Sequence, residues 1–263
     1  MQNVNGKVLG LVLVMSFAVG TLRLAAADMS AREVVSALFQ ASEGAPVDWS
    51  GKDLSNLDLS DVDFKAARLT RVNFQGSDLT RADLSGALLA LSRLDRATLI
   101  GTNFSGADLT DASLLRPNLY ADMTSAGVNL PRFNGAIMVR AHLNGRFDGV
   151  DFRRANLKDA FFGPRDPRTE ELISPMMEMR GCDFSEAQMQ GADLSRNALQ
   201  TTKFIGADVS GANFKHSNLS GADFSGANIA GADFTESIVD AARFANVRGR
   251  DSAIGLASVR QDP

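Results

Sequence analysis

Large apolar side chains recur along this chain at intervals of five residues, and a small residue stands two positions before most of them. One-residue shifts interrupt the interval after Leu119 and after Leu143, and a longer interruption follows Phe162. The runs between these breaks are 54–119, 123–143, 147–162 and 184–244. Together they hold about 36 repeats, so one short pattern governs most of the chain.

A period of five matches neither the 3.6 residues of a helical turn nor the two-residue alternation of a strand. The chain must therefore turn once per repeat to keep its large apolar side chains together. Four repeats can close into a square coil with these side chains inside, and successive coils can stack into a solenoid. At four repeats per coil we expect about nine coils, which corresponds to a rod about 43 Å long.

The repeat unit is a small residue, then Asp or Asn, then Leu or Phe, then a small polar residue. Residues 107–111 (ADLTD), 192–196 (ADLSR) and 221–225 (GADFS) are examples. This pattern resembles the pentapeptide-repeat family, and the resemblance implies an all-β fold, a right-handed quadrilateral β-helix. We interpret the acidic and amide residues, such as Asp83 and Asn103, as partners for backbone groups at tight turns.

An export signal is predicted at the N-terminus. Lys7 precedes an apolar run that continues to about Leu22, and residues 25–27 are three alanines suited to cleavage. The run is short for a membrane-spanning helix, which needs about 20 residues. We therefore expect cleavage near Ala27 and a periplasmic or secreted protein. An uncleaved membrane anchor is the alternative.

The chain divides into six predicted segments. They are a signal peptide (1–27), a helical N-terminal cap (28–50), the first part of the solenoid (51–164), an inserted loop (165–181), the second part of the solenoid (182–246) and a C-terminal cap or tail (247–263). The last segment either covers the final coil or pairs with a second copy, which would give a homodimer through the C-terminal end.

A short capping helix is predicted at the start of the solenoid. Ser30 and Glu33 have the spacing of a capping box. An open solenoid end exposes apolar side chains and an unpaired strand edge, so a cap is expected there. The apolar residues predicted to cover this end are Val34, Val35, Leu38 and Phe39, with Trp49 beside them.

Side chains capable of catalysis are few. Cys182 is the single cysteine and occupies a small inward position, so we interpret it as a buried packing thiol. The two histidines, His142 and His216, fall on outward positions about three coils apart and cannot share a site. The sequence has no nucleophile paired with a base, metal-ligand cluster or phosphate loop. We therefore predict a protein that is not an enzyme and that needs no cofactor or metal.

Two candidate binding sites emerge from the irregular parts of the pattern. Counting repeats in fours places apolar residues on outward positions of stacked coils: Ile100, Leu115, Tyr120, Ile137 and Val139. The inserted loop adds Met176, Met177 and Met179. Clustered apolar surface marks interaction sites, and methionine suits adaptable ones. The alternative in each case is structural: the strip could turn inward, and the methionines could fold back onto the solenoid.

These features favour an exported, non-catalytic scaffold that binds a protein partner of the cell envelope. The resemblance supplies an alternative, because some family members imitate duplex DNA at type II topoisomerases and act as inhibitors or protectors. Such mimicry needs about 25 negative charges on a rod of about 43 Å. The net charge of −4 becomes −6 once Lys7 and Arg23 are removed with the signal peptide. We expect no nucleic-acid partner, and membrane contact is not required.

Overall fold

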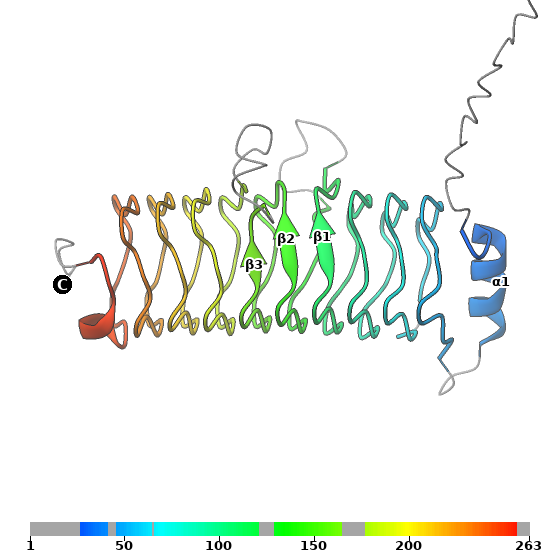
Figure 1. The fold of residues 1–263 in the computed structure, drawn as a ribbon, viewed down its shortest axis with the longest axis horizontal. Helices are drawn as coiled ribbons and strands as arrows, with labels where there is room; N and C mark the ends of the chain where they lie inside the picture. Colours follow the sequence, from blue (N-terminus) through cyan, green and yellow to red (C-terminus); the bar gives the residue numbers. More distant parts are fainter. Residues whose placement is uncertain (1–26, 42–45, 65, 121–128, 165–176, 257–263) are drawn as a thin grey trace, which may run out of the picture.

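The chain winds into a long four-sided coil, which the computed structural model describes for residues 27–41, 46–64, 66–120, 129–164 and 177–256 (Figure 1). Helix α1 (Ala31–Gln40) lies across the N-terminal end of the coil. A single 3-10 turn, η1 (Arg250–Ser252), lies near the other end. Among the described residues, an α-helix therefore covers the N-terminal end of the rod and a 3-10 turn lies near the C-terminal end.

Three short strands occur midway along the rod. They are β1 (Ser113–Leu115), β2 (His142–Asn144) and β3 (Phe161–Phe162), which form a parallel sheet in that order. Ser113 pairs with His142, and His142 pairs with Phe161. In the other described coils, each side is joined to the next coil by a single bridging residue.

Each five-residue side can be described by its central large residue, here called the centre. The residues before and after it are the pre-centre and post-centre positions, and the next residue is the corner. The centre N–H donates to the pre-centre carbonyl of the next coil, as Phe74 does to Arg93 at 2.8 Å. The pre-centre N–H donates to the previous coil, as Asn73 does to Lys52 at 2.9 Å. A side with these bonds is therefore joined to the coil before it and to the coil after it.

A β-turn at each corner redirects the chain by one side. The N–H of Ala67 donates to the centre carbonyl of Phe64 at 2.9 Å, and such turns need a positive φ at their third residue. Glycine adopts this value without cost, whereas Arg81, at φ 57°, accepts a strain on the order of 1 kcal/mol. The carboxylate of Asp83 accepts the N–H of Ser85 at 2.9 Å, which confirms the backbone role predicted for this residue type.

Parallel bridges sort the pre-centre residues into four columns, one for each face of the rod. Face A carries Asp53, Asn73, Arg93, Ser113, His142, Phe161, Asp193, Asn213, Asp233 and Ile254. Face B carries Asp58, Asp78, Thr98 and Asn118, and then Arg146, Glu178, Ala198, Asn218 and Ile238. Face C carries Asp63, Asp83, Asn103, Arg132, Asp151, Asp183, Lys203, Asp223 and Arg243. Face D carries Asp48, Arg68, Leu88, Asp108, Ile137, Asn156, Gln188, Asp208, Asn228 and Arg248.

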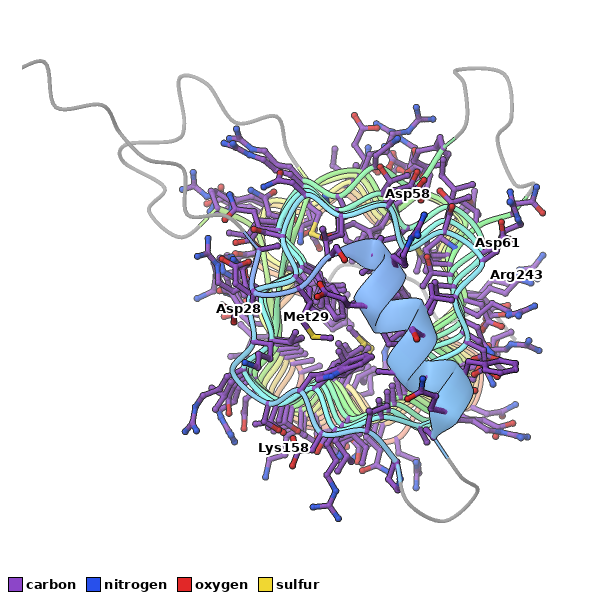
Figure 2. The ribbon with its side chains drawn as sticks, turned by 90° about the vertical axis from the view of Figure 1, so that its right-hand side faces the viewer. Asp28, Met29, Asp58, Asp61, Lys158 and Arg243 are labelled. Atoms are coloured by element: carbon purple, nitrogen blue, oxygen red, sulfur yellow. The ribbon has the colours of Figure 1, made fainter. Side chains whose placement is uncertain are left out.

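The handedness of the coil follows from the end-on view in Figure 2. From the N-terminal end, Asp58 marks face B at the top, Arg243 marks face C at the right, and Lys158 lies on face D below. Asp28, which bonds to Asp53 of face A, lies at the left. The chain thus turns clockwise as it recedes, and the coil is right-handed.

The register after Leu119 differs from the prediction. Phe133 stacks beside Phe104 on face C, so Leu119 on face B and Phe133 are consecutive centres. This step spans 14 residues instead of five, and residues 121–128 within it lie outside the described part. Met123 and Val128, at which the repeat was predicted to resume, lie outside the described residues. The prediction of two further sides between Leu119 and Phe133 is wrong, because face C follows face B directly, and it displaced residues 133–162 by two faces.

The interruption after Phe162 ends earlier than predicted. Glu178 bridges both Arg146 and Ala198 on face B, so the coil has already resumed before residue 181. Met179 is the first centre after Phe162, and its side chain is fully buried, as is that of Met177. The hypothesis of a methionine-bearing binding loop is wrong for these two residues, because they fill the core. Met176 lies outside the described residues.

Stacked phenylalanine rings form the most regular part of the core. On face C the centres from Phe104 onward are all phenylalanine, and adjacent rings lie 4.6 to 5.4 Å apart and within 11° of parallel. The rings have nearly the spacing of parallel strands, about 4.8 Å. Each ring therefore buries its faces against the rings of the coils before and after it.

Helix α1 packs on the first coil through only two of its four predicted apolar residues. Ser30 and Glu33 form a capping box, and Val34 and Leu38 are buried. Phe39 is 87% exposed, so the expectation that Val35 and Phe39 also cover the coil is wrong. The two exposed residues follow the buried ones by one position, which rotates them to the outer side of the helix.

We expect Phe224→Ala to lower the free energy of unfolding by about 3–5 kcal/mol, because it removes a ring stacked on both sides and leaves a cavity. Urea unfolding followed by circular dichroism measures this change. Ser225→Ala, at the adjacent post-centre position, is the control and should unfold at the wild-type midpoint. If the urea midpoint of Phe224→Ala shifted no more than that of Ser225→Ala, the stacked rings would not contribute to the stability of the fold.

Candidate interaction surface

The predicted apolar strip is divided among three faces. Ile100 and Tyr120 follow Thr98 and Asn118 on face B, whereas Leu115 is in β1 on face A. Ile137 and Val139 belong to face D. The five residues therefore do not form one surface, because the register assumed for the last two was displaced.

Tyr120 has a structural role on face B. Its hydroxyl donates to the carbonyl of Asp148 at 3.1 Å, and the guanidinium carbon of Arg146 lies 4.6 Å from its ring centroid. The ring is half-buried against the core, and this burial raises the pKa of the phenol. Tyr120 thus ties its coil to the next one and presents little of itself to a partner.

An apolar patch does exist on face D, on three consecutive coils. It consists of Leu88, Ala90, Leu91, Ile137 and Val139, with Asp108 and Thr110 on the coil between. Leu88 and Ile137 are each 42% exposed and Leu91 is 45% exposed. Leu88 and Ile137 stand two coils apart, about 10 Å. We call these five apolar residues the face D patch.

Charged side chains border the face D patch. Arg68 precedes Leu88 in the same column, and Arg71 precedes Leu91 at the same corner. At the far end Arg140 holds Asp111 through two hydrogen bonds of 2.8 and 2.6 Å, which lowers the pKa of that carboxyl. The patch thus has apolar residues on two coils, Asp108 on the coil between them and charged residues at both ends, and such a mixture of apolar and polar side chains is common at protein–protein interfaces.

A second apolar surface lies on the outer side of α1, where Val35 and Phe39 are exposed. Residues 1–26 and 42–45, which adjoin this helix in the chain, lie outside the described residues. Nothing described shows what covers the helix, so the face D patch is the stronger candidate. The remaining exposed large apolar residues of the described chain, Ile205, Ile238 and Ile254, stand apart from one another in the coil.

The prediction from sequence missed Leu88, Ala90 and Leu91. A signal for them was present, because pre-centre positions usually carry Asp or Asn and Leu88 breaks this rule. The same departure occurs at Ile137. Apolar pre-centre residues thus indicate an unusual outward face even where the assignment of repeats to faces is uncertain.

Cys182 and the histidines do not form a reactive site. The Cys182 thiol is buried and donates to the carbonyl of Phe147 at 3.0 Å, and burial raises its pKa. His142 is buried, contrary to the predicted outward position, because its ring packs on Phe161 and its Nε2 donates to the carbonyl of Gly163 at 2.7 Å. His216 contacts Glu236 at 3.0 Å.

Two further properties concern the described residues only. No group of three or more His, Cys, Asp or Glu side chains among them is arranged to hold a metal ion. No helix among them is long and apolar enough to cross a membrane. The predicted signal peptide lies almost wholly outside this part of the chain.

Several solved structures are similar to this chain. HetL, a pentapeptide repeat protein involved in heterocyst differentiation regulation from Nostoc, shares 19% identity over 76% of this chain and 88% of its own, with a TM-score of 0.30. QnrB1, a plasmid-mediated fluoroquinolone resistance protein, shares 23% over 77% and 89%, with a TM-score of 0.27. A thylakoid-lumen protein of Arabidopsis thaliana shares 27% over 49% and 74%, with a TM-score of 0.27.

No curated protein matches the sequence closely enough to add to this comparison. The family model for pentapeptide repeats matches eight times, at residues 47–76, 77–114, 177–197 and 199–240. The matched residues leave out 115–176, where all three interruptions of the five-residue interval occur. Members of this family fold as right-handed quadrilateral β-helices and are in general non-enzymatic structural or interaction proteins. The five-residue repeat, the four stacked faces and these matches show that the chain belongs to the pentapeptide-repeat family.

Proposed function

We propose that this protein is an exported, non-catalytic scaffold that binds a protein partner of the cell envelope through the face D patch. The observation that carries the proposal is the grouping of Leu88, Leu91 and Ile137 as exposed apolar side chains on face D and its adjoining corner. Grouped apolar surface of this kind tends to mark an interaction site.

The backbone beneath the face D patch supports binding because it is already ordered. Leu88 donates to the carbonyl of Ala67 at 3.0 Å, and Ile137 donates to that of Ala107 at 2.9 Å. The carbonyls of both residues also accept from the previous coil, since the N–H of Leu69 donates to Leu88 and the N–H of Leu109 donates to Ile137. A partner would therefore meet a surface that loses little backbone entropy on association.

The N-terminal end of the described chain is compatible with export. Asp28, the residue after the expected cleavage site, donates its N–H to the carbonyl of Asp53 at 2.7 Å. Its carboxylate accepts the N–H of Asp53 at 2.9 Å. These contacts fix Asp28 to the first coil, so cleavage after Ala27 leaves the folded part intact.

DNA mimicry is less compatible with the distribution of charge. Arg68 and Arg71 lie on or beside face D, and Arg93, Arg96 and Arg116 lie on or beside face A. A duplex mimic needs closely spaced negative charges along its length, and these arginines interrupt such a row. The alternative of an inhibitor or protector of a type II topoisomerase is therefore disfavoured.

We also propose that two copies of the chain form a homodimer through their C-terminal ends. Ile238 is the last described pre-centre residue of face B and Ile254 that of face A, and both are exposed. Apolar residues at an unpaired edge can pair with a second copy. Analytical ultracentrifugation of the mature protein tests this arrangement.

We expect the double variant Leu88→Ser/Ile137→Ser to recover at least about tenfold less of the specific partner from envelope extract, because two interface side chains lose about 1–2 kcal/mol each. Affinity purification with quantitative mass spectrometry measures recovery relative to wild type. The melting temperature should change little, because both residues are surface residues.

Ile205→Ser is the matched control, because Ile205 is 40% exposed and stands on face C. It should recover the partner as well as the wild type does. Equal recovery by the face D variant and the wild type would contradict the assignment of the site, whereas loss with the control as well would indicate nonspecific capture.

Export has its own test. We expect the full chain, expressed in a bacterium with an outer membrane, to reach the periplasm and to begin at Asp28. Cell fractionation followed by N-terminal sequencing measures both properties. A soluble cytoplasmic product that retains Lys7, or a membrane-bound product of full length, would contradict cleavage near Ala27.

A further inference from the structure

We propose that the outer side of α1 in one copy of this protein binds the face D patch of a second copy. Val35 and Phe39 are 49% and 87% exposed on that side of the helix. Seen from the N-terminal end, α1 lies in front of the coil (Figure 2). The contact uses the same patch as the proposed envelope partner, but it does not depend on that partner.

The outer side of α1 has the length of the face D patch. It carries the α1 stripe, whose residues are separated by three, four and seven positions and therefore share one side of a helix. The first and last residues of the stripe are about 10 Å apart along the helix axis. Leu88 and Ile137 are two coils apart, also about 10 Å, so a helix laid along the rod can contact the whole patch. The α1 stripe consists of Arg32, Val35, Ser36 and Phe39.

Two charged side chains at the face D patch form no ion pair with a described residue. Asp108 stands on the coil between the apolar rows, and its carboxylate accepts the N–H of Thr110 at 3.0 Å. Arg71 stands at the corner two coils earlier, where its N–H donates to the carbonyl of Ala90 at 2.8 Å. The patch thus offers a positive charge at one end and a negative charge about 10 Å further along.

Charges of opposite sign stand at matching positions on α1. Arg32, in the first turn, forms no ion pair with a described residue, and a cation at a helix N-terminus is unfavourable. The C-terminal end has the partial negative charge of the helix dipole, and no basic residue in the last turn offsets it. Arg32 and the last helical residue, Gln40, are about 12 Å apart.

These charges select one orientation of the helix. With the C-terminal end of α1 beside Arg71, the guanidinium of Arg32 reaches Asp108, and both ends of the helix gain a partner of opposite charge. The reverse orientation would set Arg32 against Arg71. In the favoured orientation Phe39 contacts Leu88 and Leu91, so apolar side chains that are exposed in the free protein cover one another.

The contact is small and does not close at two copies. It joins the end of one rod, where α1 lies, to the side of another (Figure 1). Each bound copy keeps one unused surface, so further copies can be added. An interface of a few side chains on each copy is smaller than that of a stable complex, which implies a dissociation constant in the micromolar range or weaker, roughly. An occupied patch is closed to the envelope partner.

The test is binding between two variants of the mature protein, measured by biolayer interferometry. Phe39→Ser keeps the face D patch and loses the stripe, whereas Leu88→Ser/Ile137→Ser keeps the stripe and loses the patch. We expect the two variants to bind each other with one-to-one saturation, and each to bind itself at least about tenfold more weakly. A mixed pair that binds no more tightly than the self pairs would overturn the proposal.

Ile205→Ser is the matched control, because Ile205 is 40% exposed on face C and belongs to neither surface. It should bind itself as the wild type does, and equal weakening would show nonspecific apolar association and overturn the proposal. A contact through the C-terminal ends would appear equally in every pairing. All variants should melt near the wild-type temperature. A clear drop for Phe39→Ser would show that its ring packs within its own chain, and it would also overturn the proposal.

Recovery of the envelope partner separates this proposal from the proposed function. Phe39→Ser should recover that partner at least as well as the wild type does, because its patch is free of other copies. Lower recovery would overturn competition between the two. If the wild type itself recovers no partner, the proposed function fails, whereas binding between the purified variants still decides the self-association.

Charge reversal tests the orientation of α1 on the patch. Arg32→Glu in the variant that keeps the stripe should weaken the mixed pair several-fold, because it sets a carboxylate against Asp108. Asp108→Arg in the variant that keeps the patch should restore binding. Arginine occupies the same position of the repeat at Arg68 and Arg132, so the coil accommodates it. No weakening by Arg32→Glu, or weakening that Asp108→Arg does not restore, would overturn this orientation.

Discussion

Backbone hydrogen bonds between successive coils are the interaction on which the rest of this molecule depends. Each centre donates to the next coil and each pre-centre residue donates to the previous one, so a side is ordered only between two neighbours. This pairing places identical positions above one another at the spacing of parallel strands, about 4.8 Å. The phenylalanine ladder and the Asp and Asn ladders, such as Asn103 on Asp83 at 3.0 Å, follow from that spacing.

The five-residue period was enough to predict the coil, because the pattern recurs at nearly every side. A few centres assigned wrongly therefore do not change the predicted fold. The roles of Asp83 and Cys182 also followed from their positions within a repeat. What the period could not supply was the number of sides between Leu119 and Phe133. Met123 and Val128 have the right residue types at the right interval, so only the backbone pairing of Phe104 with Phe133 reveals the true register.

The prediction of the apolar strip was wrong for the same reason, namely the incorrect count of sides after Leu119. Assigning Val139 to the face of Tyr120 required a correct count through the interruption, and the error moved an outward residue to another face. Departures from the repeat at single positions were a safer guide, because Leu88 and Ile137 are unusual whatever face they occupy. A similar departure occurs on face A, where Arg93, Ser113 and His142 replace the usual Asp or Asn at successive pre-centre positions.

The two longest interruptions of the repeat, after Leu119 and after Phe162, occur between one face and the next. They change the number of residues between stacked positions without changing the distance between coils. Sequence separation varies, because the bridge from Asp83 to Asn103 spans 20 residues whereas that from Arg146 to Glu178 spans 32. Spatial separation is nevertheless set only by the number of coils between two residues. The face D patch therefore spans only two coil spacings, about 10 Å, although the interruption after Leu119 lies between Leu88 and Ile137 in the sequence.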